Sequence, residues 1–159
     1  MKFWQFALTG LGGAVAVAVS LYFMGESKMA VLNGEITSVR TLGVEKKASV
    51  AIVDFRAKNF SDVLFVAGNR NLVVMDEHGM RWQGKIISSF DLRQIFKYFP
   101  ALGVASHEPY VEGIKLKPGQ SVVGMLAARF AMSKTELDMR RAIALEIYDV
   151  DGSLTELIR

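Results

Sequence analysis

Two histidines are the side chains best suited to acid–base or metal chemistry in this sequence, and neither lies in a recognisable site. His78 sits among turn formers in Asp76-Glu77-His78-Gly79, and His107 precedes Glu108-Pro109. A metal centre would need both histidines and additional carboxylates to meet in space, and no ligand spacing in the sequence indicates that they do. We therefore predict a solvated turn at His78 and no metal site.

Carboxylates occur in pairs where turns are expected. Asp149-Val150-Asp151-Gly152, followed by Glu156, has a superficial likeness to a calcium loop. It lacks the third acidic position and the twelve-residue spacing that ends in a bidentate glutamate. A hairpin turn is the better interpretation, and solvation explains this pair and Asp76-Glu77 alike.

The remaining chemistry is excluded by residue type or by position. The 159 residues include no cysteine, which rules out disulfides, thiolate metal ligands and covalently attached c-type haem. Gly10-Leu11-Gly12-Gly13 lies inside an uncharged apolar run and forms no phosphate cradle. The serines show no nucleophile elbow, and the basic residues are scattered. We expect no enzyme activity, no cofactor, no small-molecule substrate and no nucleic-acid partner.

Residues 3–24 carry no charged side chain, and their length suits a membrane helix. At 1.5 Å per residue these 22 residues span about 33 Å, enough for a hydrocarbon core of ~30 Å. Trp4 and Tyr22 stand near the two ends, where aromatic side chains favour the membrane interface. We predict a transmembrane anchor over residues 1–25 and one extracytoplasmic domain over residues 26–159.

A cleaved signal peptide is the alternative, because Ala14-Val15-Ala16 and Ala16-Val17-Ala18 fit the small-x-small cleavage rule. The apolar run exceeds a typical signal core and continues through Phe23, which favours a retained anchor. Lys2 and the amino terminus favour a cytoplasmic N-terminus. The chain is then a single-pass membrane protein whose C-terminal domain is periplasmic or extracellular.

One face of the predicted anchor is lined by small residues. At about 100° per residue, Thr9, Gly13, Ala16 and Ser20 share a narrow stripe, with Gly12 beside them. Small residues let helix backbones approach closely in lipid, although glycine is also generally frequent in membrane helices. We expect this stripe to pack against helices of other subunits.

Beyond Gly25 the hydrophobic pattern changes to the alternation of strands. Ala51, Val53, Phe55 and Ala57 give the clearest example. Strands are predicted over residues 30–39, 49–57, 64–67, 72–75, 81–87, 111–116, 121–130, 143–148 and 153–158. Many short strands separated by turn formers predict an all-β domain, built as a β-sandwich.

Two segments depart from the strand pattern. The spacing from Ser133 to Glu136 is that of a capping box and predicts a short helix that ends near Arg140. The second is the long connection 88–109, in which apolar side chains recur at helical spacing before Pro100: Leu92, Ile95, Phe96 and Phe99. One or two short helices are therefore expected in the connections.

The connection 88–109 and the residue just after it supply the candidates for partner contact: Phe90, Phe96, Tyr98, Phe99 and Tyr110. A connection this long in a compact sandwich is usually functional or a crossover between sheets. Its aromatic side chains could dock a partner or touch the membrane interface. Capping of the open end of the core is the plainer interpretation.

Residues 50–84 resemble membrane-anchored, immunoglobulin-like bacterial domains. An apolar strand ends in Phe55-Arg56-Ala57-Lys58-Asn59, a Ser61-Asp62 turn follows, and a valine-rich strand precedes Asp76-Glu77-His78-Gly79. The pattern is similar to the water-stress and hypersensitive-response domains of late-embryogenesis-abundant type, although Phe60 stands where that group commonly has proline. The resemblance implies an immunoglobulin- or fibronectin-like sandwich without catalytic residues.

Two functions fit these features. The first is a non-catalytic accessory subunit of a larger membrane complex, for example an energy-converting respiratory or photosynthetic assembly, by analogy at the level of architecture. Its partners would be the lipid bilayer and other subunits. The alternative is a stand-alone envelope domain that binds a ligand or protects against stress. An accessory subunit is expected to purify with companions in mild detergent, and a stand-alone domain is expected to purify alone.

Overall fold

The computed structural model describes residues 30–110 and 113–159. The predicted anchor lies outside this range, and with it the stripe of Thr9, Gly12, Gly13, Ala16 and Ser20 and the interface pair Trp4 and Tyr22. Within the described range, no helix has the length and apolar character that a membrane span requires.

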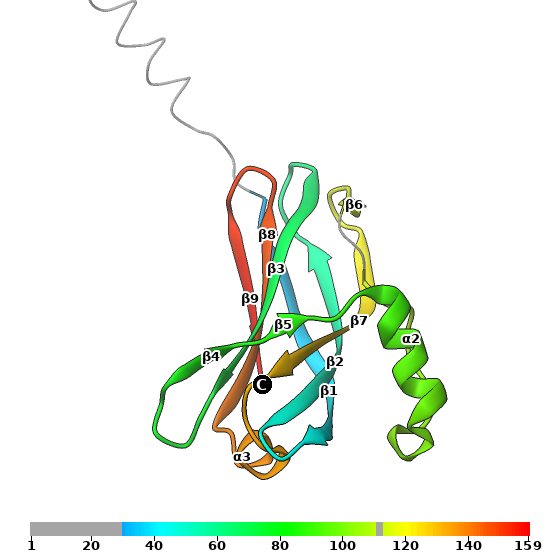
Figure 1. Cartoon of the computed structure of the whole chain (residues 1–159). Helices are drawn as coiled ribbons and strands as arrows, with labels where there is room; N and C mark the ends of the chain where they lie inside the picture. The colour runs from blue at the N-terminus through cyan, green and yellow to red at the C-terminus, as the bar shows by residue number, and fades with distance from the viewer. Residues whose placement is uncertain (1–29, 111–112) are drawn as a thin grey trace, which may run out of the picture.

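The described residues form two antiparallel sheets, which confirms the all-β expectation (Figure 1). The first sheet has the order β1-β2-β7-β5 and consists of β1 (Leu32–Glu45), β2 (Ala48–Asn59), β7 (Ser121–Phe130) and β5 (Lys85–Ile86). The second has the order β4-β3-β8-β9 and consists of β4 (Arg81–Gln83), β3 (Phe65–Met75), β8 (Ala142–Asp149) and β9 (Leu154–Ile158). A short strand, β6 (Lys115–Leu116), also pairs with β3.

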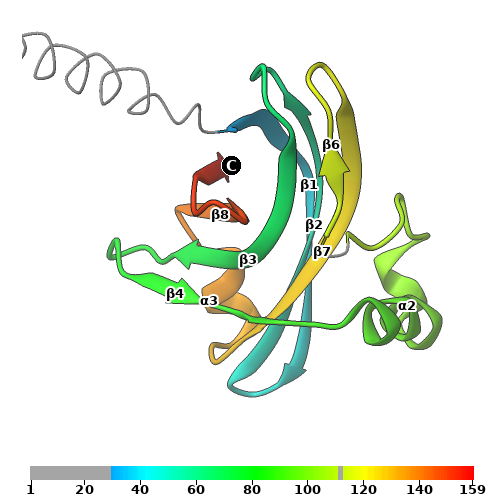
Figure 2. The same cartoon turned by 90° about the horizontal axis from the view of Figure 1, so that it is seen from above.

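The main core lies between the two sheets, which face each other in Figure 2. Alternate residues of β2 supply one side of it, as the sequence pattern predicts, and Phe55 at its centre is fully buried. Leu72 of β3 and Leu145 of β8 face it from the second sheet. Successive side chains on a strand point to opposite faces, so the other half of β2 must be covered separately.

The strands differ from the predicted ones at several places, and β1 runs to Glu45, six residues beyond the predicted end at residue 39. The predicted strands 64–67 and 72–75 are parts of one continuous strand, β3, which begins at Phe65 and whose pairing with β8 is irregular between Ala67 and Arg70. Residues 81–87 are divided at Gly84, because β4 pairs with β3 whereas β5 pairs with β7. Only residues 115–116 of the predicted strand 111–116 are seen as strand in the described part of the chain.

Gly84 lies where the chain passes from one sheet to the other. A Cβ atom there would lie 2.7 Å from the Cβ atom of Ala128 and 2.7 Å from the ring of Phe130. Such contacts are far below van der Waals separation, so the close approach of the chain to β7 at Gly84 requires a residue without a side chain. Alternation alone does not reveal this change of sheet.

Both predicted helices are present. Helix α2 (Ser89–Tyr98) is capped by Ser88, and Pro100 begins the 3-10 turn η1 (Pro100–Leu102) directly after it. Helix α3 (Lys134–Asp138) has the predicted capping box, in which Ser133 and Glu136 each bond the other's backbone amide. Hydrogen bonds from the side chain and the backbone amide of Ser133 to the Glu136 carboxylate hold the pKa of Glu136 below its usual value.

The predicted hairpin at residues 149–152 is confirmed, but solvation does not explain Asp149. Its side chain is buried, and its Oδ1 accepts hydrogen bonds from the amides of Val66 and Val150. The carboxylate thereby joins the β8–β9 turn to β3. A buried acceptor that receives two amide donors is a structural element rather than a hydrated surface group.

Candidate partner-binding surface

Helix α2 covers the outer face of the first sheet. Leu92 is buried and packs in a second apolar cluster with Val50, Ile52, Met125 and Ala127 of β2 and β7. Figure 2 shows α2 on the side of this sheet that faces away from the second sheet. The interpretation of this connection as a cap on the open end of the main core is therefore wrong: it builds a separate small core instead.

A buried carboxylate stands beside this second core. Asp54 of β2 is 1% exposed, and its Oδ2 atom accepts hydrogen bonds from Ser38 Oγ at 2.5 Å and from Arg40 Nη2 at 2.7 Å. Its other oxygen, Oδ1, lies 3.3 Å from Nδ1 of His107. Burial of a charge is costly unless the charge is paired and hydrogen-bonded, and here both carboxylate oxygens have partners.

Arg40 links this carboxylate to the connection that follows α2. Its Nη1 atom donates to the carbonyl oxygen of Val104 at 2.9 Å and, at 3.3 Å, to that of Leu102. Its guanidinium carbon lies 4.8 Å from the ring centroid of Phe96, which is within cation–π range. One cation thus joins β1, α2 and the loop after η1.

The Asp54–His107 pair combines a carboxylate and an imidazole, the two groups that catalytic dyads use. A dyad needs a nucleophile or a substrate beside the second imidazole nitrogen, with the carboxylate orienting the ring. Within the described residues, the side chain of His107 contacts Asp54 and bonds to no hydroxyl group. Ser38, the nearby hydroxyl, is bonded to the carboxylate itself. The geometry fits a structural role in which the Asp54–His107 pair fixes the connection after α2 to β2.

The five predicted partner-contact residues fall into two groups, those that are exposed and those that pack into the domain. Phe90, Tyr98 and Phe99 are 65%, 70% and 41% exposed. Phe96 instead packs into the second cluster beneath Arg40. For Tyr110, which is buried, the prediction of direct partner contact is wrong. For Phe96, which is only partly buried, it stays a prediction.

Tyr110 belongs to the main core. It is 4% exposed, and its ring meets that of Phe55 edge to face at a centroid distance of 5.2 Å. Burial raises the pKa of Tyr110 to about 12, partly opposed by the positive charge of Arg70. The backbone explains this position, because Tyr110 and Glu108 bond Met125 of β7 and draw the end of the connection onto the sheet.

The exposed apolar side chains of this region define what we call the α2 surface: Phe90, Tyr98, Phe99 and Val104. Val104 is 87% exposed. Phe90 and Tyr98 are eight residues apart and therefore lie on the same side of α2. Leu92 and the contacts of Arg40 fix the face of the helix that lies on the first sheet. The exposed aromatic side chains therefore project from a firmly packed helix.

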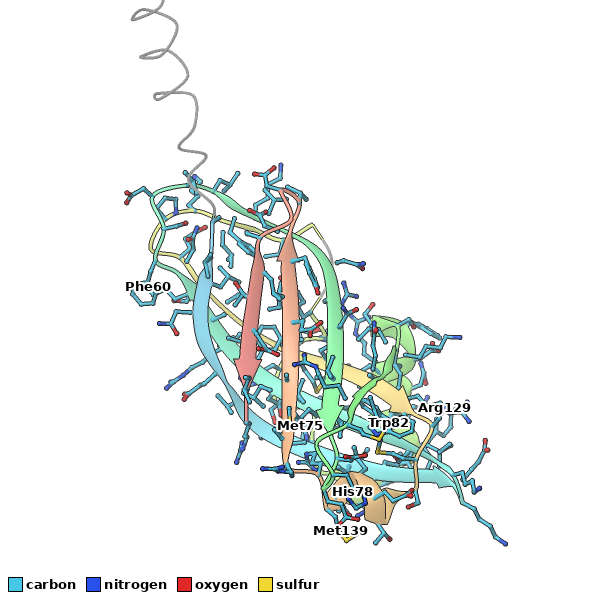
Figure 3. All side chains as sticks on the ribbon, turned by 90° about the vertical axis from the view of Figure 1, so that its left-hand side faces the viewer. Phe60, Met75, His78, Trp82, Arg129 and Met139 are labelled. Carbon is cyan, nitrogen blue, oxygen red and sulfur yellow. The ribbon has the colours of Figure 1, made fainter. Side chains whose placement is uncertain are left out.

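His78 lies far from His107, in the β3–β4 turn. Its side chain is solvated, as predicted, and lines a groove of about 150 Å³ with Trp82, Met139 and neighbouring residues (Figure 3). Trp82 Nε1 donates to Asp76, which holds the pKa of Asp76 below its usual value. The groove is smaller than the ~300–1,000 Å³ of typical ligand sites. No cluster of three or more metal-ligating side chains occurs in residues 30–110 and 113–159.

Sequence reasoning missed Ser38, Arg40, Asp54 and Val104. One signal was present, because Asp54 interrupts an otherwise apolar run from Val50 to Phe55. A charge at that position of a strand buried on both faces indicates a buried ion pair. Its partner could not be named from the sequence, since Arg40 is brought to it by strand pairing: Ser38 is directly opposite Asp54, and Arg40 is opposite Ile52.

Comparisons with known proteins give little beyond this geometry. No family model and no curated protein matches the chain. A solved structure of the archaellum periplasmic stator protein FlaG from Sulfolobus acidocaldarius is similar with a TM-score of 0.34 and 11% identity, over 82% of this chain and 100% of that one. The stator complex of FlaF and FlaG from the same organism gives 0.31 and 11%, over 84% and 94%. Likeness at these TM-scores is too low to support a conclusion about fold or function.

Proposed function

We propose that the chain is a non-catalytic accessory subunit of a larger membrane complex, whose domain contacts its partner through the α2 surface. The observation that supports this most directly is the contrast between the two sides of α2. One side is buried on the first sheet, and the other presents Phe90, Tyr98 and Phe99 to solvent. Large aromatic side chains on a firm base are typical of the residues that dominate binding energy at protein interfaces.

The membrane part of the proposal comes from the sequence. Residues 3–24 are uncharged over a length that matches the hydrocarbon core, and their small-residue stripe suits packing against a neighbouring helix. With Lys2 on the cytoplasmic side, the β domain stands outside the cytoplasm. The bilayer and other subunits are then the two partners of the chain.

We further propose an immunoglobulin-like sandwich for the domain. The order β1-β2-β7-β5 opposite β4-β3-β8-β9 corresponds to strands A-B-E-D opposite C′-C-F-G of immunoglobulin-type domains. In this correspondence the connection 88–110 occupies the place between strands D and E. Such loops, held by a rigid sandwich, are where these folds place their binding surfaces.

The test compares purified complexes of wild type and a double variant, Phe90→Ser/Tyr98→Ser. The full chain is extracted from native membranes in mild detergent through a C-terminal tag, and its companions are quantified by mass spectrometry. We expect wild type to retain companions in fixed ratio. The double variant should lose them, because each aromatic contact is worth about 2 kcal/mol, or roughly 30-fold in affinity.

The matched control is Leu154→Ser/Ile158→Ser. These two side chains are also exposed, at 45% and 60%, but they lie on β9 of the second sheet. The control should retain the companions. A wild-type chain that purifies alone would reject the accessory-subunit role in favour of the stand-alone alternative, and equal loss in both double variants would reject the α2 surface as the contact.

A further inference from the structure

The end of the domain where the described chain begins carries a group of exposed apolar side chains, here called the apolar tip: Val31, Phe60, Leu64 and Val150. Their exposed fractions are 47%, 66%, 45% and 63%. They come from the start of the described chain, the β2–β3 loop and the β8–β9 turn, which gather at one end of the sheets (Figure 1). Figure 3 shows Phe60 at this end and His78 and Met139 at the other.

The β2–β3 loop of the tip is held firmly by Asn59. Its side-chain amide donates to the carbonyl oxygens of Val63 and Leu116, both at 2.8 Å, and its Oδ1 accepts from Ser61. Asn59 itself is fully buried. These bonds fasten the loop with Phe60 exposed. Because Asn59 is buried and hydrogen-bonded, its amide is not free for N-glycosylation, although Asn59-Phe60-Ser61 matches the sequon for that modification.

The β8–β9 turn is fastened to the same end. Asp149 binds the amide of Val66, and Ser153 Oγ donates to the carbonyl oxygen of Ala30 at 2.6 Å. The amide of Leu32 donates to Thr155 Oγ1 at 2.9 Å. These bonds tie the beginning of the described chain to the turn that presents Val150.

Chain length places this end near the bilayer. The uncharged apolar run of the predicted anchor ends at Met24, and five residues separate it from Ala30. At ~3.3–3.6 Å per residue, even a fully extended connection reaches only about 20 Å. By contrast, the 14 residues of β1 place the far end of the domain about 45 Å further along the strand.

We propose that the apolar tip rests on the lipid surface and inserts Phe60 and Val150 into the headgroup region. This inference rests on the membrane anchoring proposed above. Removal of apolar side chains from water supplies the attraction, and the charges at the tip are mixed, with Lys58 and Lys117 alongside Asp62 and Asp151. Contact with neutral lipid is therefore expected. It would fix the orientation of the domain, and with it the height of the α2 surface above the membrane.

The absence of cysteine allows a clean test with single labels. Val150→Cys in the full chain is labelled with an environment-sensitive fluorophore, and the protein is reconstituted alone into phosphatidylcholine vesicles. The matched control is Met80→Cys, which is 58% exposed on the β3–β4 turn at the other end. We expect the Val150 label to shift to the blue and to be quenched several-fold more strongly than the Met80 label by lipids that carry a quencher near the headgroup.

The outcomes distinguish a failure of the apolar-tip proposal from a failure of the membrane anchoring on which it rests. If the protein floats with vesicles and the Val150 label behaves like the Met80 label, the tip proposal is overturned while anchoring stands. If the protein does not float, both proposals are overturned. A second variant, Phe60→Asp in the Val150→Cys background, should remove most of the quenching while flotation is unchanged; unaltered quenching would contradict a role for Phe60.

Discussion

Arg40→Met is expected to lower the free energy of unfolding by about 3–5 kcal/mol, because it leaves the buried Asp54 carboxylate without its cationic partner. Methionine keeps an unbranched apolar side chain against Phe96, so lost packing contributes little. The carbonyl oxygens of Leu102 and Val104 lose their donor in the same step. Urea unfolding of residues 26–159, followed by circular dichroism and the fluorescence of Trp82, measures the change.

The control for this prediction is the double variant Arg40→Met/Asp54→Asn. Asparagine removes the unpaired charge and can still accept from Ser38 Oγ, so the double variant should be more stable than Arg40→Met alone. Such non-additivity is the signature of two groups that act as a pair. A single variant within about 1 kcal/mol of wild type, or effects that simply add, would show that Asp54 does not depend on Arg40.

Gly34→Ala is expected to cost about 3 kcal/mol, at the upper end of ordinary overpacking. A Cβ atom at Gly34 would lie 2.1 Å from the carbonyl oxygen of Arg56 and 2.6 Å from Cα of Ala57. Both are backbone atoms of β2, so no side-chain rotation relieves the clash and the pairing of β1 with β2 must open. The same unfolding assay applies.

Gly43→Ala serves as the matched control, because Gly43 lies on the same strand. There a methyl group would meet the side chain of Lys134 at 3.3 Å, which can move aside. Glycine is also unfavourable inside a strand. We expect a change of less than about 1 kcal/mol; equal losses for the two variants would mean that the β1–β2 spacing at Gly34 is not the cause.

Much of the fold follows from local patterns, since alternation located most of the strands and the Ser133 capping box located α3. The sequence could not indicate that α2 covers the outer face of the first sheet. Helical spacing identifies Leu92 and Ile95 as one apolar stripe, but it does not say which surface that stripe meets. The apolar run from Val50 to Val53 in β2 was the available hint, because a strand buried on both faces needs a second cover.

The candidate site was predictable only in part, for a related reason. Of the aromatic candidates for partner contact, Phe90, Tyr98 and Phe99 are exposed in the structure. Phe96 and Tyr110 are aromatic residues of the same segment, but long-range contacts cover Phe96 in part, beneath Arg40, and bury Tyr110 against Phe55. The polar group at Asp54 depends on strand register and on the return of the chain at His107, which no local pattern encodes.

The two proposals fit together geometrically. The apolar tip sets the end of the domain that meets lipid, and the α2 surface lies on the outer face of the first sheet, beside the strands rather than at the tip (Figure 1). A partner reached by α2 would therefore stand next to this domain on the same side of the membrane. An accessory subunit of this kind works through orientation and contact, with no need for a chemical step.

The most direct test of this account is site-specific photo-crosslinking in intact membranes, with a photoreactive phenylalanine analogue in place of Tyr98 or, as control, Ile158. Both positions are exposed, Tyr98 on α2 outside the first sheet and Ile158 on β9 of the second sheet. The account predicts that irradiation at position 98 yields one discrete adduct with another membrane-complex subunit, and that position 158 yields none. No adduct at position 98, or the same adducts from both positions, would contradict it.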